Sequence, residues 1–186
     1  MSSAGPDGLF FRPLSSTCRI GAFSCGNVEI DKWFAKSARK SHDSFKSRVT
    51  TVRLEESGDP VGFYALGIAL EDERFLERGK FAQIETRSVN RQFPALQFQW
   101  LAVRREHQNR GIGTVMIGRV IDVFIDAVEN LGLPVMTLTA ANSRVAAFYK
   151  RLGFDHYGGP GSMRMLLPAD SALELRRFGT TDSEPT

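Results

Sequence analysis

Two glycines separated by one residue stand at the start of a long apolar stretch, in the segment QNRGIG at residues 108–113. Glycine has no side chain, so Gly111 and Gly113 let the backbone approach a ligand closely. The N–H groups and the dipole at a helix N-terminus attract anions such as phosphate. Arg110 adds a counter-charge. The segment predicts a phosphate-binding loop, although glycine pairs also open helices in ordinary turns.

Spacing separates this loop from two common phosphate-binding loops. A Walker A loop has lysine after its last glycine, whereas Thr114 follows Gly113 here and no lysine stands nearby. A Rossmann loop has a third glycine where this chain has Met116, and an acid after the next strand, where this chain has Thr139 and two alanines. The remaining pattern is Q-x-x-G-x-G between a strand and a long helix.

A second segment that can do chemistry follows about 30 residues later. It reads ANSRVAAFYKRLGF, residues 141–154. Asn142 precedes a helix that carries Tyr149, and the segment ends in Leu-Gly-Phe. Val145, Tyr149 and Leu152 share one helix face, so Tyr149 can be either a reactive phenol or part of the core.

Hydrophobic spacing predicts the elements that position these segments. We expect a helix over residues 27–40 with Asn27 as its N-cap, and a hairpin of the strands VTTVRLE and PVGFYALGIAL. Residues 71–93 are charged and irregular, and we expect a short helix and a long loop there. Then come a strand ending at Val103, a helix ended by Gly132, the strand PVMTLTA, the helix after Asn142 and a closing hairpin. This order predicts a mixed α/β fold with helices on the faces of one sheet.

Length and composition favour one soluble domain in a chain of 186 residues. We expect a flexible leader over residues 1–8, a single domain over 9–168 and a partly disordered C-terminal extension over 169–186. No apolar run is long enough for a membrane helix, and no export signal is evident, so we expect a cytoplasmic protein. Cys18 and Cys25 are interpreted as free thiols, and the three histidines have no ligand spacing, so we expect no metal.

Together the two motifs resemble the GCN5-related N-acetyltransferase (GNAT) family over roughly residues 10–167. The resemblance implies the GNAT fold, a mixed and mostly antiparallel sheet whose splayed strands surround acetyl-CoA. It implies acetyl-CoA as cosubstrate and assigns the acetyl carbonyl to backbone N–H groups of the strand before the loop. The cofactor-binding residues by this resemblance are Leu101, Ala102, Val103, Gln108, Asn109, Arg110, Gly111, Ile112, Gly113, Thr114, Asn142 and Phe148.

Tyr149 corresponds to the tyrosine that protonates the leaving sulfur in many family members. A phenol with an ordinary pKa of about 10 is protonated at neutral pH and close enough to a thiol's pKa of about 8.5 to donate. Asn142 can hydrogen-bond the pantetheine arm, cap its helix, or do both. For the general base, Glu71, Glu106, His107 and a water path all remain open.

Residues 23–67 resemble more narrowly the acetyltransferase toxins of bacterial toxin–antitoxin pairs. The matching positions are Phe23, Cys25, Gly26, Asn27, Trp33, Ser47, Arg48, Val61, Gly62, Tyr64, Ala65 and Leu66. The resemblance implies acetylation of the amino acid on charged tRNA, a block of translation, a ribbon-helix-helix antitoxin and a homodimer. Ser24 and Trp100 depart from the pattern, since toxins usually carry an acid and often an arginine at those positions. An acetyltransferase for small or protein amines, and a regulatory acetyl-CoA-binding module, are the alternatives.

Positive charge gathers in residues 32–53, which hold seven cations and one acid and therefore carry a net charge of +6. Such a cluster can contact an RNA backbone, or it can be the solvated face of an amphipathic helix. The expected substrate-binding residues are Lys32, Lys36, Arg39, Lys40, Arg48, Arg91 and Arg104, with Arg87 and Arg105 as extensions.

Overall fold

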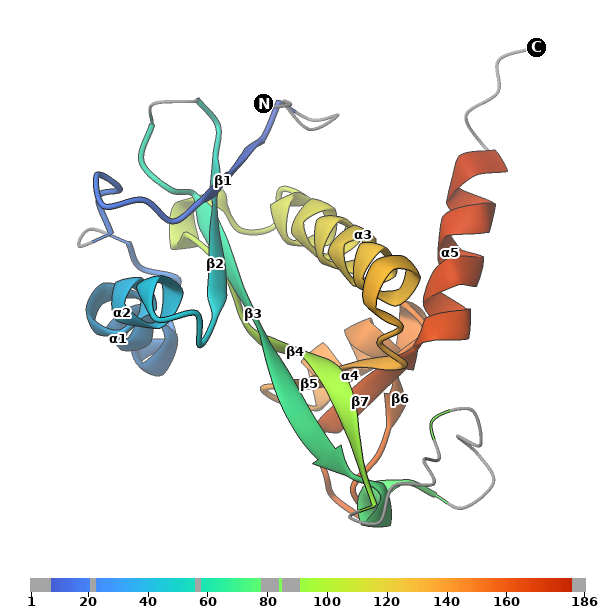
Figure 1. Cartoon of the computed structure of the whole chain (residues 1–186). Helices are drawn as coiled ribbons and strands as arrows, with labels where there is room; N and C mark the ends of the chain where they lie inside the picture. Colours follow the sequence, from blue (N-terminus) through green and yellow to red (C-terminus); the bar gives the residue numbers. More distant parts are fainter. Residues whose placement is uncertain (1–7, 21–22, 56–57, 78–83, 85–90, 182–186) are drawn as a thin grey trace. The chain divides into compact units, whose positions relative to one another are not determined.

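The computed structural model describes residues 8–20, 23–55, 58–77, 84 and 91–181. The expected leader, except Gly8, and the candidate RNA contact Arg87 lie outside these residues. The chain divides into two compact units, one of Met1–Gly67 with Phe98–Arg119 and one of Ile68–Gln97 with Val120–Thr186. Figure 1 shows the elements in chain order.

Across the described residues, seven strands form one sheet in the order β1-β2-β3-β4-β5-β7-β6. The strands are β1 Phe10–Pro13, β2 Arg48–Arg53, β3 Gly62–Asp72, β4 Gln92–Val103, β5 Val135–Thr139, β6 Asp155–His156 and β7 Arg164–Pro168. The pairs β1–β2, β2–β3, β5–β7 and β6–β7 are antiparallel. The predicted mixed α/β class is confirmed, whereas β1 was not among the predicted strands.

In the first unit, α1 Val28–Lys36 and α2 Ala38–Asp43 replace the single helix predicted over residues 27–40, so that prediction was wrong. Ser37 has φ −118° and ψ −27°, and it serves as the C-cap of α1 and the N-cap of α2. Asn27 caps α1 as predicted, because its side chain accepts from the N–H of Glu29 at 3.0 Å and of Ile30 at 3.3 Å.

Aromatic packing holds α1 in the first unit. The Phe34 ring stacks on Phe63 of β3 at 3.9 Å between centroids, and Phe23 meets both rings edge-on at 5.0 Å and 5.3 Å. Trp33 extends this stack, since its ring lies 6.0 Å from Phe63 and 5.4 Å from Trp100 of β4. Burial of these rings supplies much of the unit's hydrophobic stabilisation.

The second unit contains most of α3 Ile112–Leu131, together with α4 Ser143–Arg151 and α5 Ala169–Thr181. Gly132, with φ 68°, ends α3 as predicted. The helix α5 was not among the predicted elements. Its Arg176 pairs with Glu129 of α3, a contact that the local sequence pattern does not indicate.

The stretch over residues 71–93 contains a short helix, as expected, but its boundaries differ from the prediction by one or two residues at each end. The strand β3 continues to Asp72 and is followed by a short 3-10 helix, Glu73–Phe75. The strand β4 already begins at Gln92. Residues 78–83 and 85–90 lie outside the described part of the chain.

The described residues lack two features, a membrane-spanning helix and a metal-binding cluster. None of their helices is long and apolar enough to cross a membrane. Nor do three or more of their histidine, cysteine, aspartate or glutamate side chains gather where a metal ion could bind.

Candidate functional site

The predicted phosphate loop connects β4, which ends at Val103, to α3, which begins at Ile112. The backbone turns through left-handed conformations at Asn109, with φ 59°, and Gly111, with φ 79°. In the described part of the chain, five successive N–H groups donate to no protein acceptor; they belong to Asn109, Arg110, Gly111, Ile112 and Gly113. The next N–H, of Thr114, donates to the Gly111 carbonyl at 2.9 Å. The loop therefore offers a run of unused donors at a helix N-terminus, as an anion site requires.

The two loop glycines are there for different reasons. Gly111 has φ +79°, a conformation that other residues adopt only with strain, although a Cβ there would meet nothing within 4 Å. At Gly113, with no left-handed φ, a Cβ would meet only the Val103 side chain, at an ordinary 3.8 Å. The fold therefore requires glycine at position 111 but not at 113. Packing within the protein therefore does not explain the glycine at position 113.

The exposed Gln108 holds this loop through two side-chain hydrogen bonds. Its side-chain amide donates to the Val103 carbonyl at 2.9 Å and to the Cys25 carbonyl at 2.8 Å. Beside it, the N–H of Arg105 donates to the Ser24 carbonyl at 2.9 Å. The sequence motif marked Gln108 as a cofactor contact, whereas its amide protons are already used to tie the loop to the segment before α1.

That segment is held in turn by Asp31 of α1, which accepts from the Ser24 hydroxyl at 2.7 Å and the Cys25 N–H at 2.8 Å. Burial opposes ionisation of Asp31, but these hydrogen bonds outweigh it and lower the pKa of the carboxyl. Burial, followed by the neighbouring Asp31, raises the pKa of the Cys25 thiol to about 11. Cys25 is therefore a protonated thiol and a poor nucleophile at neutral pH.

A hollow of about 410 Å³ opens beside the unused N–H groups. Its lining combines loop residues with apolar side chains: Leu9, Leu54, His107, Arg110, Gly111, Ile112 and Val115. The buried Nδ1 of His107 has no partner among the described residues. Its Nε2 lies 3.6 Å from the carboxylate of Glu106, so these two candidate bases lie together beside the loop.

Tyr149 lies in the second unit, on α4. Its side chain is 8% exposed, and its ring packs edge-on against Phe148 at 5.6 Å and Phe154 at 5.4 Å. Burial raises the pKa of Tyr149 to about 12. The expectation of an ordinary phenol pKa was therefore wrong, and Tyr149 is a protonated but weaker acid than the sequence suggested.

Asn142 caps α4, because its side-chain oxygen accepts from the Val145 N–H at 3.0 Å. The capping role predicted from the sequence is confirmed. Its side-chain NH₂ donates to no acceptor among the described residues, and the residue is exposed.

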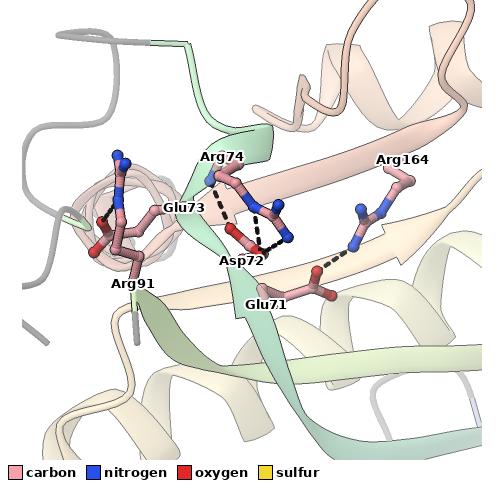
Figure 2. Close-up of polar contacts among 6 residues, drawn as sticks. All are labelled: Glu71, Asp72, Glu73, Arg74, Arg91 and Arg164. Atoms are coloured by element: carbon pink, nitrogen blue, oxygen red, sulfur yellow. Dashed lines mark hydrogen bonds and ion pairs between the residues drawn. The ribbon is translucent and has the colours of Figure 1, made fainter. Parts of the chain in front are cut away.

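Glu71, another candidate base, is committed to an ion pair. Figure 2 shows three consecutive carboxylates, each paired with an arginine: Glu71 with Arg164, Asp72 with Arg74 and Glu73 with Arg91. Glu71 is 7% exposed as a side chain and also accepts from the Thr137 hydroxyl at 3.3 Å. The Arg164 guanidinium lies over the rings of Phe75 at 4.8 Å and Tyr157 at 4.6 Å. This arrangement fixes the end of β3 and engages the Glu71 carboxylate with Arg164 and Thr137.

The expected RNA contacts are divided by the structure. Lys32, Lys36 and Lys40 are exposed on α1 and α2, and Lys36 and Lys40 line an open hollow of about 660 Å³. Arg39 instead donates to the Ser15 and Cys18 carbonyls and anchors α2.

Three further arginines complete the expected set. Arg48 is exposed at the start of β2. The Arg104 side chain is 16% exposed and lies 3.5 Å from Glu106. Arg91 belongs to the other unit, where it pairs with Glu73. The exposed basic surface therefore consists mainly of α1, α2 and the start of β2.

Comparison with known proteins places these features in a family. Residues 47–156, more than half of the chain, match the acetyltransferase (GNAT) domain. The chain is 27% identical over 149 residues to a tRNA-acetylating toxin of Mycobacterium tuberculosis, covering 77% of this chain and 82% of the relative. It is 24% identical over 166 residues to a probable toxin TacT of Sinorhizobium fredii, covering 83% and 87%.

Solved structures have the same fold. A crystal structure of a KacT mutant aligns with a TM-score of 0.80 at 21% identity, over 90% of this chain and 99% of that one. AtaT complexed with acetyl-methionyl-tRNAfMet aligns with a TM-score of 0.79 at 20% identity, again over 90% and 99%. AtaTR bound with AcCoA aligns with a TM-score of 0.77 at 21% identity, over 91% and 99%. The predicted family is confirmed, and the chain belongs to the GNAT acetyltransferases.

Proposed function

We propose that this N-acetyltransferase transfers the acetyl group of acetyl-CoA to the α-amine of the amino acid on charged tRNA, and so blocks translation. The observation that carries the proposal is the exposed basic surface of α1 and α2 in the same compact unit as the phosphate loop. A positively charged surface attracts the negatively charged phosphates of an RNA backbone. Likeness to a tRNA-acetylating toxin supports the same substrate.

The donor is held mainly by backbone in this proposal. The unused N–H groups from Asn109 to Gly113 bind the diphosphate, with Arg110 as counter-charge and Thr114 at the helix start. Backbone N–H groups of Leu101, Ala102 and Val103 hold the acetyl carbonyl and stabilise the oxyanion. The free side of the Asn142 amide and the Phe148 ring contact the pantetheine arm.

Tyr149 supplies the proton to sulfur. The amine attacks the thioester carbonyl, the carbon–sulfur bond breaks, and the leaving sulfur accepts a hydrogen bond and then the proton from the phenol. A phenol with a pKa of about 12 retains its proton throughout the physiological range. Burial that disfavours the phenolate also disfavours a neighbouring thiolate, so the two pKa values rise together and transfer remains feasible.

The acceptor amine needs little help from a base. Esterification of the carboxyl lowers the pKa of an amino acid's α-amine toward neutrality, so much of it is already unprotonated. Glu71 is engaged with Arg164, which leaves His107, Glu106 or water to take the proton.

We further propose that a cognate antitoxin of the ribbon-helix-helix type neutralises this enzyme, and that it acts as a cytoplasmic homodimer. The structure of AtaT bound to the C-terminus of the antitoxin AtaR supports the first part by analogy. Size-exclusion chromatography with light scattering tests the second part.

The direct test incubates the purified chain with radiolabelled acetyl-CoA and charged tRNA. We expect label on the aminoacyl group, which mild alkali releases as the N-acetyl amino acid, and arrest of a cell-free translation reaction. Label confined to polyamines or protein lysines would instead support the alternative acetyltransferase function.

A further inference from the structure

Phe45, in the turn after α2, combines two unfavourable features. Its side chain is 80% exposed. Its backbone has φ 59°, in the left-handed region that bulky residues rarely adopt. Strain of this kind persists where the surrounding structure imposes it, and it is concentrated at functional sites.

The turn is held firmly on both sides. The N–H groups of Lys46 and Ser47 donate to the Ser41 carbonyl at 3.0 Å and 3.2 Å, and that of Phe45 donates to the His42 carbonyl at 3.2 Å. Farther on, the N–H of Val49 donates to Nδ1 of His42 at 3.0 Å. The Phe45 ring is therefore presented to solvent by a rigid turn.

The same turn is attached to β4. The buried Ser47 donates its hydroxyl to the Gln99 side chain at 2.5 Å. Gly67 makes room for this contact, since a Cβ there would lie 2.5 Å from the Gln99 amide nitrogen and 3.1 Å from the Lys46 carbonyl. Gln99 stands two residues before Leu101, so the anchor lies about 7 Å along the strand from the backbone proposed to hold the acetyl group.

The chemistry around the ring is that of a nucleic-acid contact. The Arg48 guanidinium lies 5.6 Å from the ring centre, and both Lys46 and Arg48 are exposed. The neighbours of the ring along the chain, Asp43 and Ser44 before it and Lys46 after it, are exposed and polar. A single exposed ring among cations matches one nucleobase flanked by phosphates.

We propose that Phe45 is a stacking platform for an unpaired base at the 3′ end of the aminoacylated RNA, with Lys46 and Arg48 neutralising the adjoining phosphates. The inference rests on the proposed function and specifies how the substrate is held. The aminoacyl ester sits at the unpaired 3′ end of tRNA, and unpaired bases are those that proteins recognise by stacking on aromatic rings. An anchor about one nucleotide from the acetyl site is in reach of that end.

Steady-state kinetics with Phe45→Asn, Phe45→Leu and Phe45→Trp test the proposal. Asparagine tolerates left-handed backbone, so Phe45→Asn removes the ring without a loss of stability. For Phe45→Asn and Phe45→Leu, we expect the KM for aminoacyl-tRNA to rise roughly tenfold, the effect of losing one stacked base. The KM for acetyl-CoA stays unchanged, and Phe45→Trp behaves as the wild type. Val28→Asn is the matched control, because Val28 is also 80% exposed.

Fluorescence of Phe45→Trp gives a second measurement. The emission that it adds to the wild-type signal should be quenched by uncharged tRNA, and not by tRNA trimmed of its unpaired 3′ nucleotides. Equal quenching by both RNAs would overturn the proposal. So would an unchanged KM in Phe45→Asn, a Phe45→Leu enzyme equal to the wild type, or a loss of self-association in parallel with activity. If the wild type acetylates no aminoacyl-tRNA, the proposed function itself fails.

Discussion

The lysines of α1 and α2 in the first unit and the arginines beside the carboxylates of the second unit differ in whether they are paired. In the first, Lys32, Lys36 and Lys40 are exposed and pair with no carboxylate in the described part of the chain. In the second, carboxylates and arginines neutralise one another, at Glu71 with Arg164 and at Glu129 with Arg176. Exposed charge without a partner suits recognition of an anion, whereas paired charge stabilises one packing arrangement. We therefore predict that removal of the exposed lysine charges in the first unit weakens RNA binding. Removal of a paired charge in the second unit should instead lower the free energy of unfolding.

The largest effect on catalysis is expected from a change at Tyr149, whose buried phenol lies in the second unit. We expect Tyr149→Phe to lower kcat roughly 10²–10⁴-fold, the usual contribution of a positioned proton donor. Its melting temperature should stay close to that of the wild type, because the ring remains. Induced expression without an antitoxin should arrest growth only for the wild type. An unchanged kcat would make Tyr149 a core residue only.

Gly113→Ala, a change in the first unit, should lower the affinity for coenzyme A. The added methyl fits the protein but obstructs a ligand, so we expect the Kd from calorimetry to rise roughly tenfold or more, the equivalent of one hydrogen bond to a charged group. Gly118→Ala is the control, since a Cβ at this exposed position on the same helix meets nothing within 4 Å. Equal affinity in the two variants would contradict the role of the bare backbone.

Glu71→Gln should affect stability and leave catalysis intact. Removing the carboxylate's charge leaves Arg164 without its counter-ion, and we expect the free energy of unfolding to fall by about 1–3 kcal/mol. Denaturant unfolding measures this change, and the kcat of the folded enzyme should remain near the wild-type value. A kcat loss of several hundredfold in a stable variant would restore Glu71 as the general base.

The double variant Lys36→Gln, Lys40→Gln should impair substrate binding and leave stability unchanged, in contrast to Glu71→Gln. We expect unchanged stability, weaker tRNA binding and a salt dependence whose log–log slope falls by about 0.7 for each phosphate that the variant no longer neutralises. Lys150→Gln, at an exposed position of the second unit, is the matched control. Identical slopes for both variants would show that α1 and α2 do not contact the RNA.

The smallest effect is expected from the raised pKa of Tyr149 on the pH dependence of the activity. Activity should rise with pH while the acceptor amine loses its proton, and then stay level from about pH 8 to about pH 10. Tyr149 must be protonated to act, and its raised pKa of about 12 moves the loss of that proton beyond this range. A falling limb near pH 9 that disappears in Tyr149→Phe would contradict the raised pKa.

Much of the fold could be predicted because its signals are local. Asn27 and Asn142 cap their helices through contacts two or three residues away, and Gly132 ends α3 through its own backbone conformation. The loop glycines likewise follow from spacing. Ser37 divided a helix whose apolar pattern continues across it, and α5 depends on packing that its weak pattern does not indicate. Both elements make contacts with distant residues, Arg39 of α2 with the Ser15 and Cys18 carbonyls and Arg176 of α5 with Glu129.

The amino-acid sequence alone determined the family, the position of the phosphate loop and the order of the main elements, because glycine conformation, helix caps and hydrophobic spacing act within a few residues. Only the tertiary structure decided what individual side chains do. Gln108 binds a carbonyl 83 residues away, and Glu71 binds an arginine 93 residues away. The folded backbone brings these partners together, and burial in the folded chain raises the pKa of Tyr149. No local pattern encodes these contacts, since each depends on surfaces brought together only when the chain folds.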